Sequence, residues 1–378
     1  MGKPRMTWTI DKVNLLKAHR SAGLEITQIA NAMGLTYDQV DGALKRYGIR
    51  DEIPYVNSKK ETNSIIIKKQ EIAECAKYLG EKLYENYKRI NLPVPSVIKN
   101  KNKKEEHSVL DLSDVHIGTK NEVFDGTTGK KIITYNEKIF KQELAILQKS
   151  MFNIHNLLSN AYNLKHLTIF VMGDIVTNDR IFMEQVFEIE KVVGLQIWDA
   201  VEYFTVFFNN LLRIYETITI VGVPGNHGRS LPNMYSEPIE NNFEYHLYRI
   251  WQKQFDNNKR IKIIVPDTRR YIHKIYNFKH MIEHGDSIKG SSETAILKQI
   301  KELYLAVNGF DIFHMGHFHT IKELEMGDQA IIKQNGSWIA QDNYAWDKFK
   351  TYSLPKQFFF GCNEHRSETW NYRIDLRG

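Results

Sequence analysis

Short apolar runs recur through the central and C-terminal parts of the chain, and each soon stops at a glycine, proline or aspartate. The runs occupy residues 109–112, 167–172, 218–223, 281–282 and 310–315. Apolar runs of this kind, closed by turn-forming residues, are typical of buried strands that lead into loops. In layered α/β folds, ligands gather outside the ends of such strands. The pattern therefore predicts an α/β fold with several loops meeting at one cleft.

Side chains that bind metals follow each of these runs. The five motifs are Asp114-x-His116, Gly173-Asp174, Gly225-Asn226-His227, His284-Gly285 and Gly316-His317-x-His319. Their donors are imidazoles, carboxylates and an amide, without a thiolate, a set that suits divalent Mn, Fe or Zn rather than a Cys-rich structural zinc site. Any one motif can arise by chance as a turn or a packed histidine. Five of them in order at strand ends predict a metal centre.

With these motifs, residues 107–340 resemble the calcineurin-like metallophosphoesterases. The resemblance implies a two-sheet α/β sandwich flanked by helices, with two divalent ions. Mn²⁺ is the preferred ion, and Mg²⁺, Fe²⁺ and Zn²⁺ are alternatives. The resemblance further implies that the first ion is held by Asp114, His116, Asp174 and His319, and the second by Asp174, Asn226, His284 and His317. His227 would lie beside the scissile phosphate without binding metal, and an imidazole there can give a proton to the leaving group.

Within that superfamily, the chain is most similar to SbcD-type and phage DNA repair nucleases. The shared segments are Gly225-Asn226-His227-Gly228-Arg229, Asn241-Asn242-Phe243 and Asn335-Gly336-Ser337-Trp338. Thr177 stands where those enzymes usually carry a histidine, which leaves exonuclease directionality open. Arg229 directly follows the GNH turn and is a candidate to bind substrate phosphate. Since only a short C-terminal segment follows these motifs, we expect no SMC-like ATPase partner.

Composition gives no sign of a membrane or secreted protein. The 378 residues contain no run of 18 apolar residues and no charged–apolar–small pattern at the N-terminus. The two cysteines, Cys75 and Cys362, cannot form a disulfide framework, which fits a reducing cytoplasm. We therefore expect a cytoplasmic protein without membrane contact.

Positive charge is concentrated in the N-terminal part. Residues 1–107 carry 20 Lys and Arg against 13 Asp and Glu, whereas the remainder carries 31 against 32. A basic module beside a phosphoesterase indicates a polyanionic substrate. The simpler alternative is a solvated, Lys-rich spacer.

The first fifty residues have a helical pattern. The expected helices cover residues 8–23, 26–35 and 36–47. Ala30, Gly34 and Val40 have the spacing of a helix-turn-helix, which this segment resembles, and Thr36 is the expected N-cap of the last helix. The chain is thus expected to contain a helix-turn-helix over 1–50, a charged helical spacer over 51–106 and a catalytic domain over 107–378.

The last of these helices carries the candidate contacts to DNA, which are Tyr37, Gln39, Lys45 and Arg46. Lys45 and Arg46 suit contact with phosphates. Asp38 and Asp41 on the same helix disfavour it. Small three-helix units also serve in protein docking or dimerisation, so a homodimer remains an alternative.

Three functions are consistent with these features. The favoured one is a metal-dependent DNA phosphodiesterase, an endo- or exonuclease, brought to DNA by the N-terminal module. The second is a hydrolase of cyclic nucleotides or nucleotide pyrophosphates, whose N-terminal module serves assembly. The third is a binding protein that keeps its metal site for structure.

Overall fold

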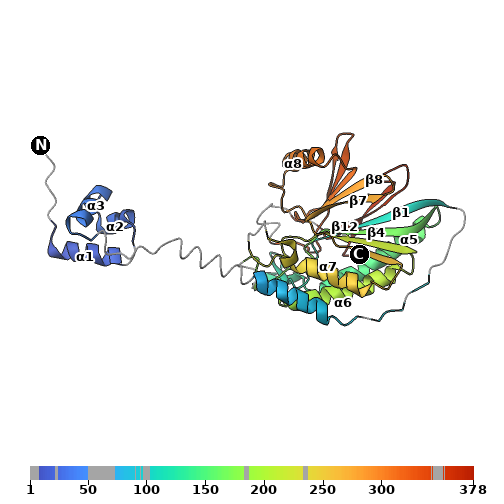
Figure 1. The fold of residues 1–378 in the computed structure, drawn as a ribbon, viewed down its shortest axis with the longest axis horizontal. Coiled ribbons are helices and arrows are strands. Elements are labelled where there is room, and N and C mark those ends of the chain that lie inside the picture. Colours follow the sequence, from blue (N-terminus) through green and yellow to red (C-terminus); the bar gives the residue numbers. More distant parts are fainter. Residues whose placement is uncertain are drawn as a thin grey trace. The chain divides into compact units, whose positions relative to one another are not determined.

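The computed structural model describes residues 8–21, 24–49, 73–89, 91–93, 95–96, 103–182, 187–232, 237–341, 343, 352 and 354–378. The chain forms two compact units, Met1–Gln70 and Glu71–Gly378 (Figure 1). The short sequence motifs for metal binding all belong to the second unit. No helix in the described part of the chain combines the length and the apolarity needed to cross a bilayer.

Three short helices make up the described part of the first unit: α1 (Ile10–Ser21), α2 (Ile26–Met33) and α3 (Tyr37–Arg46). They enclose a small core that includes Leu16, Ile29 and Val40. Gly34 ends α2 with φ of 65°, a left-handed conformation that glycine adopts without steric cost. Thr36 caps α3 as predicted, because its hydroxyl accepts the N–H of Gln39 and the Gln39 side chain accepts the N–H of Thr36.

Two β-sheets form the centre of the second unit. The six-stranded sheet has the order β13-β12-β1-β4-β5-β6, with strands β1 (Lys104–Leu112), β4 (Tyr162–Val171), β5 (Thr217–Gly222), β6 (Ile261–Ile264), β12 (Lys356–Cys362) and β13 (Trp370–Asp375). The five-stranded sheet has the order β10-β11-β9-β8-β7, with strands β7 (Arg270–Ile275), β8 (Phe278–Glu283), β9 (Ile312–Met315), β10 (Lys322–Met326) and β11 (Ala330–Gln334). Strands β1, β4, β5 and β6 are parallel, as are β8, β9 and β11.

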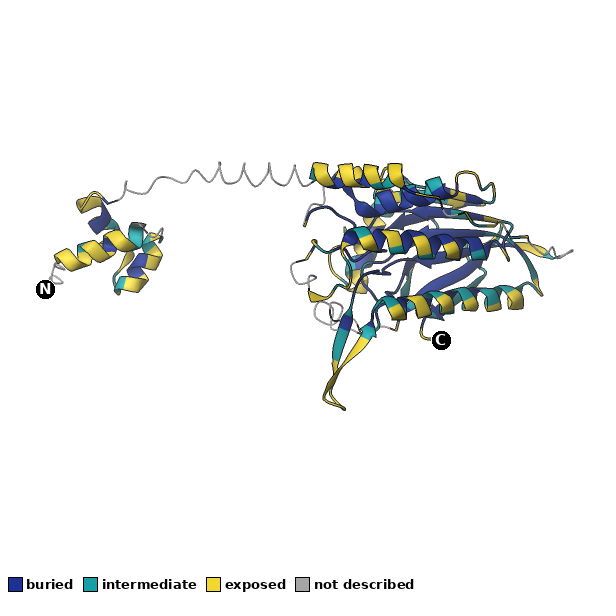
Figure 2. Ribbon diagram, turned by 90° about the horizontal axis from the view of Figure 1, so that it is seen from below, coloured by how far each residue is buried: buried dark blue, intermediate teal, exposed yellow. Residues whose placement is uncertain are grey.

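Helices cover the outer faces of both sheets (Figures 1 and 2). This unit contains α5 (Glu137–Leu158), α6 (Val193–Leu211), α7 (Phe243–Gln254) and α8 (Glu293–Ala306). A 3₁₀ turn (Ile239–Asn241) precedes α7, and a separate ribbon consists of β2 (Asn121–Asp125) and β3 (Lys130–Tyr135). The predicted mixed α/β class is confirmed.

The central strands are buried on both faces, which explains their continuous apolar runs. In β4, Leu167 and Ile169 belong to the core shared with α5, α6 and α7. Phe170 of the same strand belongs to the core between the two sheets, together with Ile282 of β8 and Ile312 of β9. A third core packs the second sheet against α8. These cores fix the two sheets face to face and so set the position of every strand end.

The expected spacer over 51–106 differs from the structure in its second half. A helix over 73–86 packs on the α/β unit, which therefore begins at Glu71 rather than at 107. Ala76 and Tyr87 are buried in the main core, and the Tyr87 ring stacks on Trp198 of α6 at 5.8 Å. The segment has many charged residues, so its narrow apolar stripe, which contacts α6 and α7, was not recognised in the sequence.

Glu143 is a buried acid on α5 whose ionisation should limit stability. Burial, reinforced by the Asp375 carboxylate, raises its pKa from 4.5 to about 9. Below pH 4.5 both the folded and the unfolded chain hold the proton, so stability is greatest there with respect to this group. As pH rises toward 9 the unfolded chain has lost the proton while the folded chain keeps it, and stability falls.

Glu143→Gln should therefore raise the free energy of unfolding by about 1–3 kcal/mol at pH 8 and change it little at pH 4.5. Urea unfolding at both pH values measures this, with Glu302→Gln on the exposed face of α8 as the control. An equal effect at the two pH values would contradict the ionisation argument.

Candidate metal centre

The seven predicted metal ligands follow the carboxyl ends of five strands. Asp114 and His116 follow β1, Asp174 follows β4, and Asn226 follows β5 in the first sheet; His284 follows β8, and His317 and His319 follow β9 in the second. Within each sheet these strands are parallel neighbours, so their carboxyl ends lie at one edge. Six of the seven, together with His227, form three overlapping groups in which the ligand atoms lie within 4.8 Å of one another.

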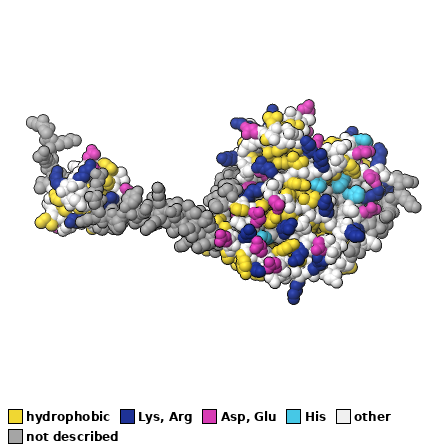
Figure 3. Space-filling view, viewed as in Figure 1, with side chains coloured by type: hydrophobic (Ala, Val, Ile, Leu, Met, Phe, Trp, Pro, Cys, Tyr) yellow, Lys and Arg dark blue, Asp and Glu magenta, His cyan; other side chains and the backbone are white. Residues whose placement is uncertain are grey.

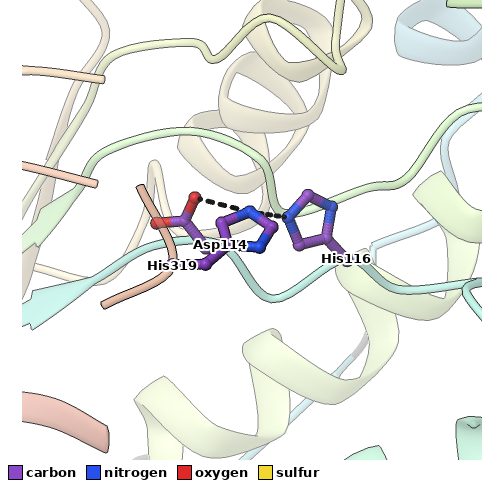
Figure 4. Close-up of side chains that lie close together, drawn as sticks. All are labelled: Asp114, His116 and His319. Atoms are coloured by element: carbon purple, nitrogen blue, oxygen red, sulfur yellow. Dashed lines mark hydrogen bonds and ion pairs between the residues drawn. The ribbon is translucent and has the colours of Figure 1, made fainter. Parts of the chain in front are cut away.

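The first of these groups contains Asp114, His116 and His319 (Figure 4). The Nε2 atoms of His116 and His319 are 3.0 Å apart, and Nε2 of His319 is 3.5 Å from Oδ1 of Asp114. All three residues are buried. The Asp114 carboxylate is held in place because Oδ1 accepts the N–H of His317 at 2.9 Å.

Asp174 is the centre of the second group. Its Oδ2 is 3.0 Å from Nε2 of His284, and the same nitrogen is 3.1 Å from Oδ1 of Asn226. His317 completes this group, and its ring lies 5.2 Å from that of His284. Since Asp174 also belongs to a group with His116, it lies between the two clusters. This is the position of a bridging ligand.

The tautomer of His284 shows that this donor set fits a metal ion. Its Nδ1 lies 2.7 Å from the carbonyl oxygen of Met172, and because a carbonyl can only accept, Nδ1 carries the hydrogen. This leaves the Nε2 lone pair facing the oxygens of Asp174 and Asn226. Three electron-pair donors so close together repel unless a proton or a cation lies among them. A histidine anchored to a carbonyl through its other nitrogen is also typical of metal ligands.

The ionisation of the site follows the same logic. Burial would lower the pKa of His284, but the Asp174 carboxylate raises it to about 10. Burial disfavours the charged form of Asp174, yet His284 and His227 outweigh it and hold the pKa of its carboxyl well below the ordinary value. Without a cation, a proton on His284 therefore compensates Asp174. A divalent ion held by these residues would take the place of that proton.

The ligands sit on an unusual backbone. Asp114, His116, Asp174, His317 and His319 all have positive φ, between 52° and 71°. Such conformations are costly for residues other than glycine and concentrate at functional sites. Tertiary contacts must therefore hold these ligand residues in conformations that a free chain disfavours.

Two glycines of the motifs make room for ligand carboxylates. A Cβ on Gly225 would overlap the carboxylate of Asp174, and a Cβ on Gly316 would overlap that of Asp114. Neither glycine has a positive φ, so a side chain is excluded here by the close approach of the ligand carboxylate and not by the backbone conformation.

His227 lies at the edge of the centre, with its side chain 13% exposed. Its Nδ1 donates to the carbonyl of Thr177 at 2.8 Å, and its Nε2 is 3.9 Å from Oδ2 of Asp174. Its ring lies 4.6 Å from that of His116 and 5.2 Å from that of Phe182. His227 also forms a group of potential ligands with His116 and Asp174, so its position suits either a ligand or a proton donor.

Three of the remaining candidates, Arg229, Gln39 and Lys45, are already engaged in contacts within the chain. The Arg229 guanidinium pairs with Asp286, and its side chain is 5% exposed. In the first unit, the Gln39 side chain completes the cap of α3 and Lys45 pairs with Asp41 at 2.8 Å. Tyr37, Lys45 and Arg46 are exposed on α3.

Three further residues support the ligands, and of these only Asn335 belongs to a segment that the sequence resemblance had included. Glu244 accepts hydrogen bonds from the loop of Asp174, and Asn178 donates to the carbonyls of His227 and Arg229 at 2.7 and 2.8 Å. Asn335 contacts Ser113, next to Asp114, at 3.1 Å. These residues bind backbone or neighbouring side chains rather than metal. The residue types and spacing of Glu244 and Asn178 match no metal motif, so the sequence contained no signal for these two residues.

Comparisons with known proteins give weak structural likeness only. No protein-family model and no curated protein matches the sequence. Vps29 from Entamoeba histolytica, in complex with Zn²⁺, aligns with 71% of this chain and 99% of its own at 13% identity and a TM-score of 0.31. A predicted phosphoesterase from Streptococcus pneumoniae TIGR4 aligns with 71% of this chain and 98% of its own at 9% identity and a TM-score of 0.30. The 5′-nucleotidase from Candida albicans SC5314 aligns with 74% of this chain and 53% of its own at 11% identity and a TM-score of 0.33. Likeness at TM-scores this low carries no argument about function.

Asp174→Ala should abolish binding of both metal ions, because this carboxylate lies in a group with His116 and in another with His284 and His317. Elemental analysis of protein dialysed against Mn²⁺ and isothermal titration measure the number of ions bound. Asp328→Ala, in an exposed turn, serves as the control. Retention of two ions by the Asp174 variant would refute the bridging role.

Proposed function

We propose that the protein is a phosphoesterase that uses two divalent metal ions, preferably Mn²⁺, to hydrolyse phosphodiester bonds of DNA. The observation that carries the proposal is the convergence of imidazole, carboxylate and amide donors from five strand ends, with an additional imidazole at the edge. Asp114, His116, Asp174 and His319 would hold one ion; Asp174, Asn226, His284 and His317 would hold the other. Ions held there supply Lewis acidity, which neutralises phosphoryl charge and lowers the pKa of water.

His227 is suited to assist the leaving group. Its Nδ1 hydrogen is fixed on the carbonyl of Thr177, so Nε2 is the atom that faces the centre. When water attacks phosphorus and the bond to the leaving oxygen breaks, that oxygen needs a proton, and a protonated His227 delivers it from Nε2. Asp174, 3.9 Å from Nε2, stabilises the positive charge of the imidazolium before transfer.

Charge and sequence resemblance favour DNA as the substrate. The excess of positive charge lies in residues 1–107, and Lys45 and Arg46 are exposed at the end of α3. By contrast, basic and acidic side chains alternate over the face of the second unit seen in Figure 3. A basic auxiliary unit next to a nearly neutral phosphoesterase is expected for a polyanionic substrate.

Incubation of the full chain with Mn²⁺ and end-labelled single- and double-stranded DNA tests the proposal. We expect cleavage that stops on adding a chelator, and product mapping then distinguishes endonuclease from exonuclease activity. If the protein hydrolyses cyclic nucleotides or nucleotide pyrophosphates and leaves DNA intact, those small molecules are its substrates instead of DNA. A metal-loaded chain inert toward every phosphoester would refute the enzyme and favour a binding protein.

His227→Ala should keep both metal ions and lose most turnover, by about 10²–10⁴-fold, the usual contribution of a general acid. Metal content and the kcat for DNA cleavage are measured on the same preparation. His365→Ala, an exposed histidine between β12 and β13, is the matched control. Unchanged kcat in the His227 variant would remove this residue from the mechanism, and loss of metal would make it a ligand.

The double variant Lys45→Glu/Arg46→Glu should weaken DNA binding and flatten its dependence on salt. With fewer phosphate contacts, the protein releases fewer counterions from DNA when it binds. Fluorescence anisotropy at several salt concentrations measures both quantities. The double substitution Lys298→Glu/Lys301→Glu on α8 makes the same change of charge in the other unit. Identical curves for the α3 variant and the parent would assign the first unit another role, such as assembly.

A further inference from the structure

Glu244 is a buried acid that binds two metal-ligand loops at once. It lies in the first turn of α7 and is fully buried. Its Oε2 accepts the backbone N–H of Asp174 at 3.1 Å and that of Gly225 at 2.7 Å. Its Oε1 accepts the N–H of Ile175 at 2.5 Å and that of Val176 at 3.2 Å. One carboxylate thus gathers four amides from the loops that follow β4 and β5.

The start of α7 holds the second of these loops from other directions as well. Asn242, the N-cap of α7, donates from Nδ2 to the carbonyl of Gly225 at 3.1 Å. The N–H of Phe243 donates to the carbonyl of Gly228 at 2.6 Å. The loop that carries Asn226 and His227 is therefore bound on both sides of these two residues.

Capping of its own helix does not explain the contacts that the Glu244 side chain makes. An acid in the first turn does stabilise a helix through the dipole. However, all four donors to the carboxylate lie outside α7, and the α7 cap is already supplied by Asn242, which accepts the N–H of Glu244 at 2.9 Å. The Glu244 carboxylate therefore binds the two ligand loops and does not cap α7.

We propose that Glu244 is a positioning residue that sets the distance between Asp174 and the Asn226–His227 pair and thereby determines the affinity of the metal centre. Asp174 has a left-handed backbone, with φ of 52°, which tertiary contacts must hold. Without the carboxylate, four N–H groups in a buried region lose their acceptor, and the loops relax to satisfy them elsewhere. The inference rests on the metal centre proposed above, and extends it to a residue that touches neither metal nor substrate.

Glu244→Gln tests the proposal because it changes the shape of the side chain least. The carboxamide oxygen can still accept, but its NH2 group now faces backbone N–H groups that need an acceptor. We expect Mn²⁺ affinity to fall about 10–100-fold, the usual effect of losing a residue that orients metal ligands. Isothermal titration of the full chain with Mn²⁺ measures affinity, and circular dichroism confirms that the variant is folded. Raising Mn²⁺ should restore kcat, as expected for a loss of metal occupancy.

Tyr245→Phe is the matched control. Tyr245 is the next residue of α7, and its hydroxyl donates to Oδ1 of Asp267 at 2.8 Å, outside the two ligand loops. This variant should lower the melting temperature without changing Mn²⁺ affinity. If Glu244→Gln is folded and binds Mn²⁺ as tightly as the parent does, Glu244 is not a positioning residue. If the parent itself binds no Mn²⁺, the metal centre fails instead.

Should Glu244→Gln not fold, Glu244→Asp keeps the charge but shortens the reach to the amides. The measurement is then the rise in melting temperature on adding Mn²⁺, which reports affinity for the folded state. A smaller rise than in the parent supports the proposal, and an equal rise overturns it.

Discussion

Mutual repulsion among closely packed donor atoms is the constraint on which the site depends. The imidazole nitrogens of His116 and His319 face each other at 3.0 Å, and His284 faces the oxygens of Asp174 and Asn226 at 3.0 and 3.1 Å. Such an arrangement is unfavourable in a buried region unless a hydrogen or a cation lies between the facing atoms. The fold must hold these atoms together before any ion arrives, and much of the structure can be understood as the means of doing so.

Hydrogen bonds between loops supply much of this constraint. The N–H of Asp114 donates to the carbonyl of Gly173, and that of His116 donates to the carbonyl of Asp174, so the loops after β1 and β4 continue the pairing of their strands. Glu244 ties the loop after β4 to the loop after β5. The strained left-handed residues thus lie within a network that leaves them few alternative conformations.

A buried polar bridge joins the two sheets behind the site. Asp111 of β1 accepts from Nδ1 of His314 on β9 at 2.9 Å, and Nε2 of His314 lies 3.0 Å from Nδ1 of His280 on β8. Asp111 lies three residues before Asp114, and His314 lies three residues before His317. Because a buried hydrogen-bonded chain tolerates only one register, it fixes how the ligand-bearing ends of β1 and β9 meet.

The sequence by itself determined the strand ends and the metal-binding motifs that follow them, because apolar runs and metal-binding residue types are local signals. The resemblance to a known family then selected the seven candidate ligands from those motifs. The sequence also determined the three helices of the first unit and the Thr36 cap. It did not reveal that the helix over 73–86 packs on the α/β unit. A stripe of a few apolar residues among many charged ones does not show in the sequence which surface it contacts. Nor did the sequence reveal Glu244 or the pairing of Arg229 with Asp286. Those contacts join residues far apart in the chain, and only tertiary packing decides which backbone amides and charges come within hydrogen-bonding distance.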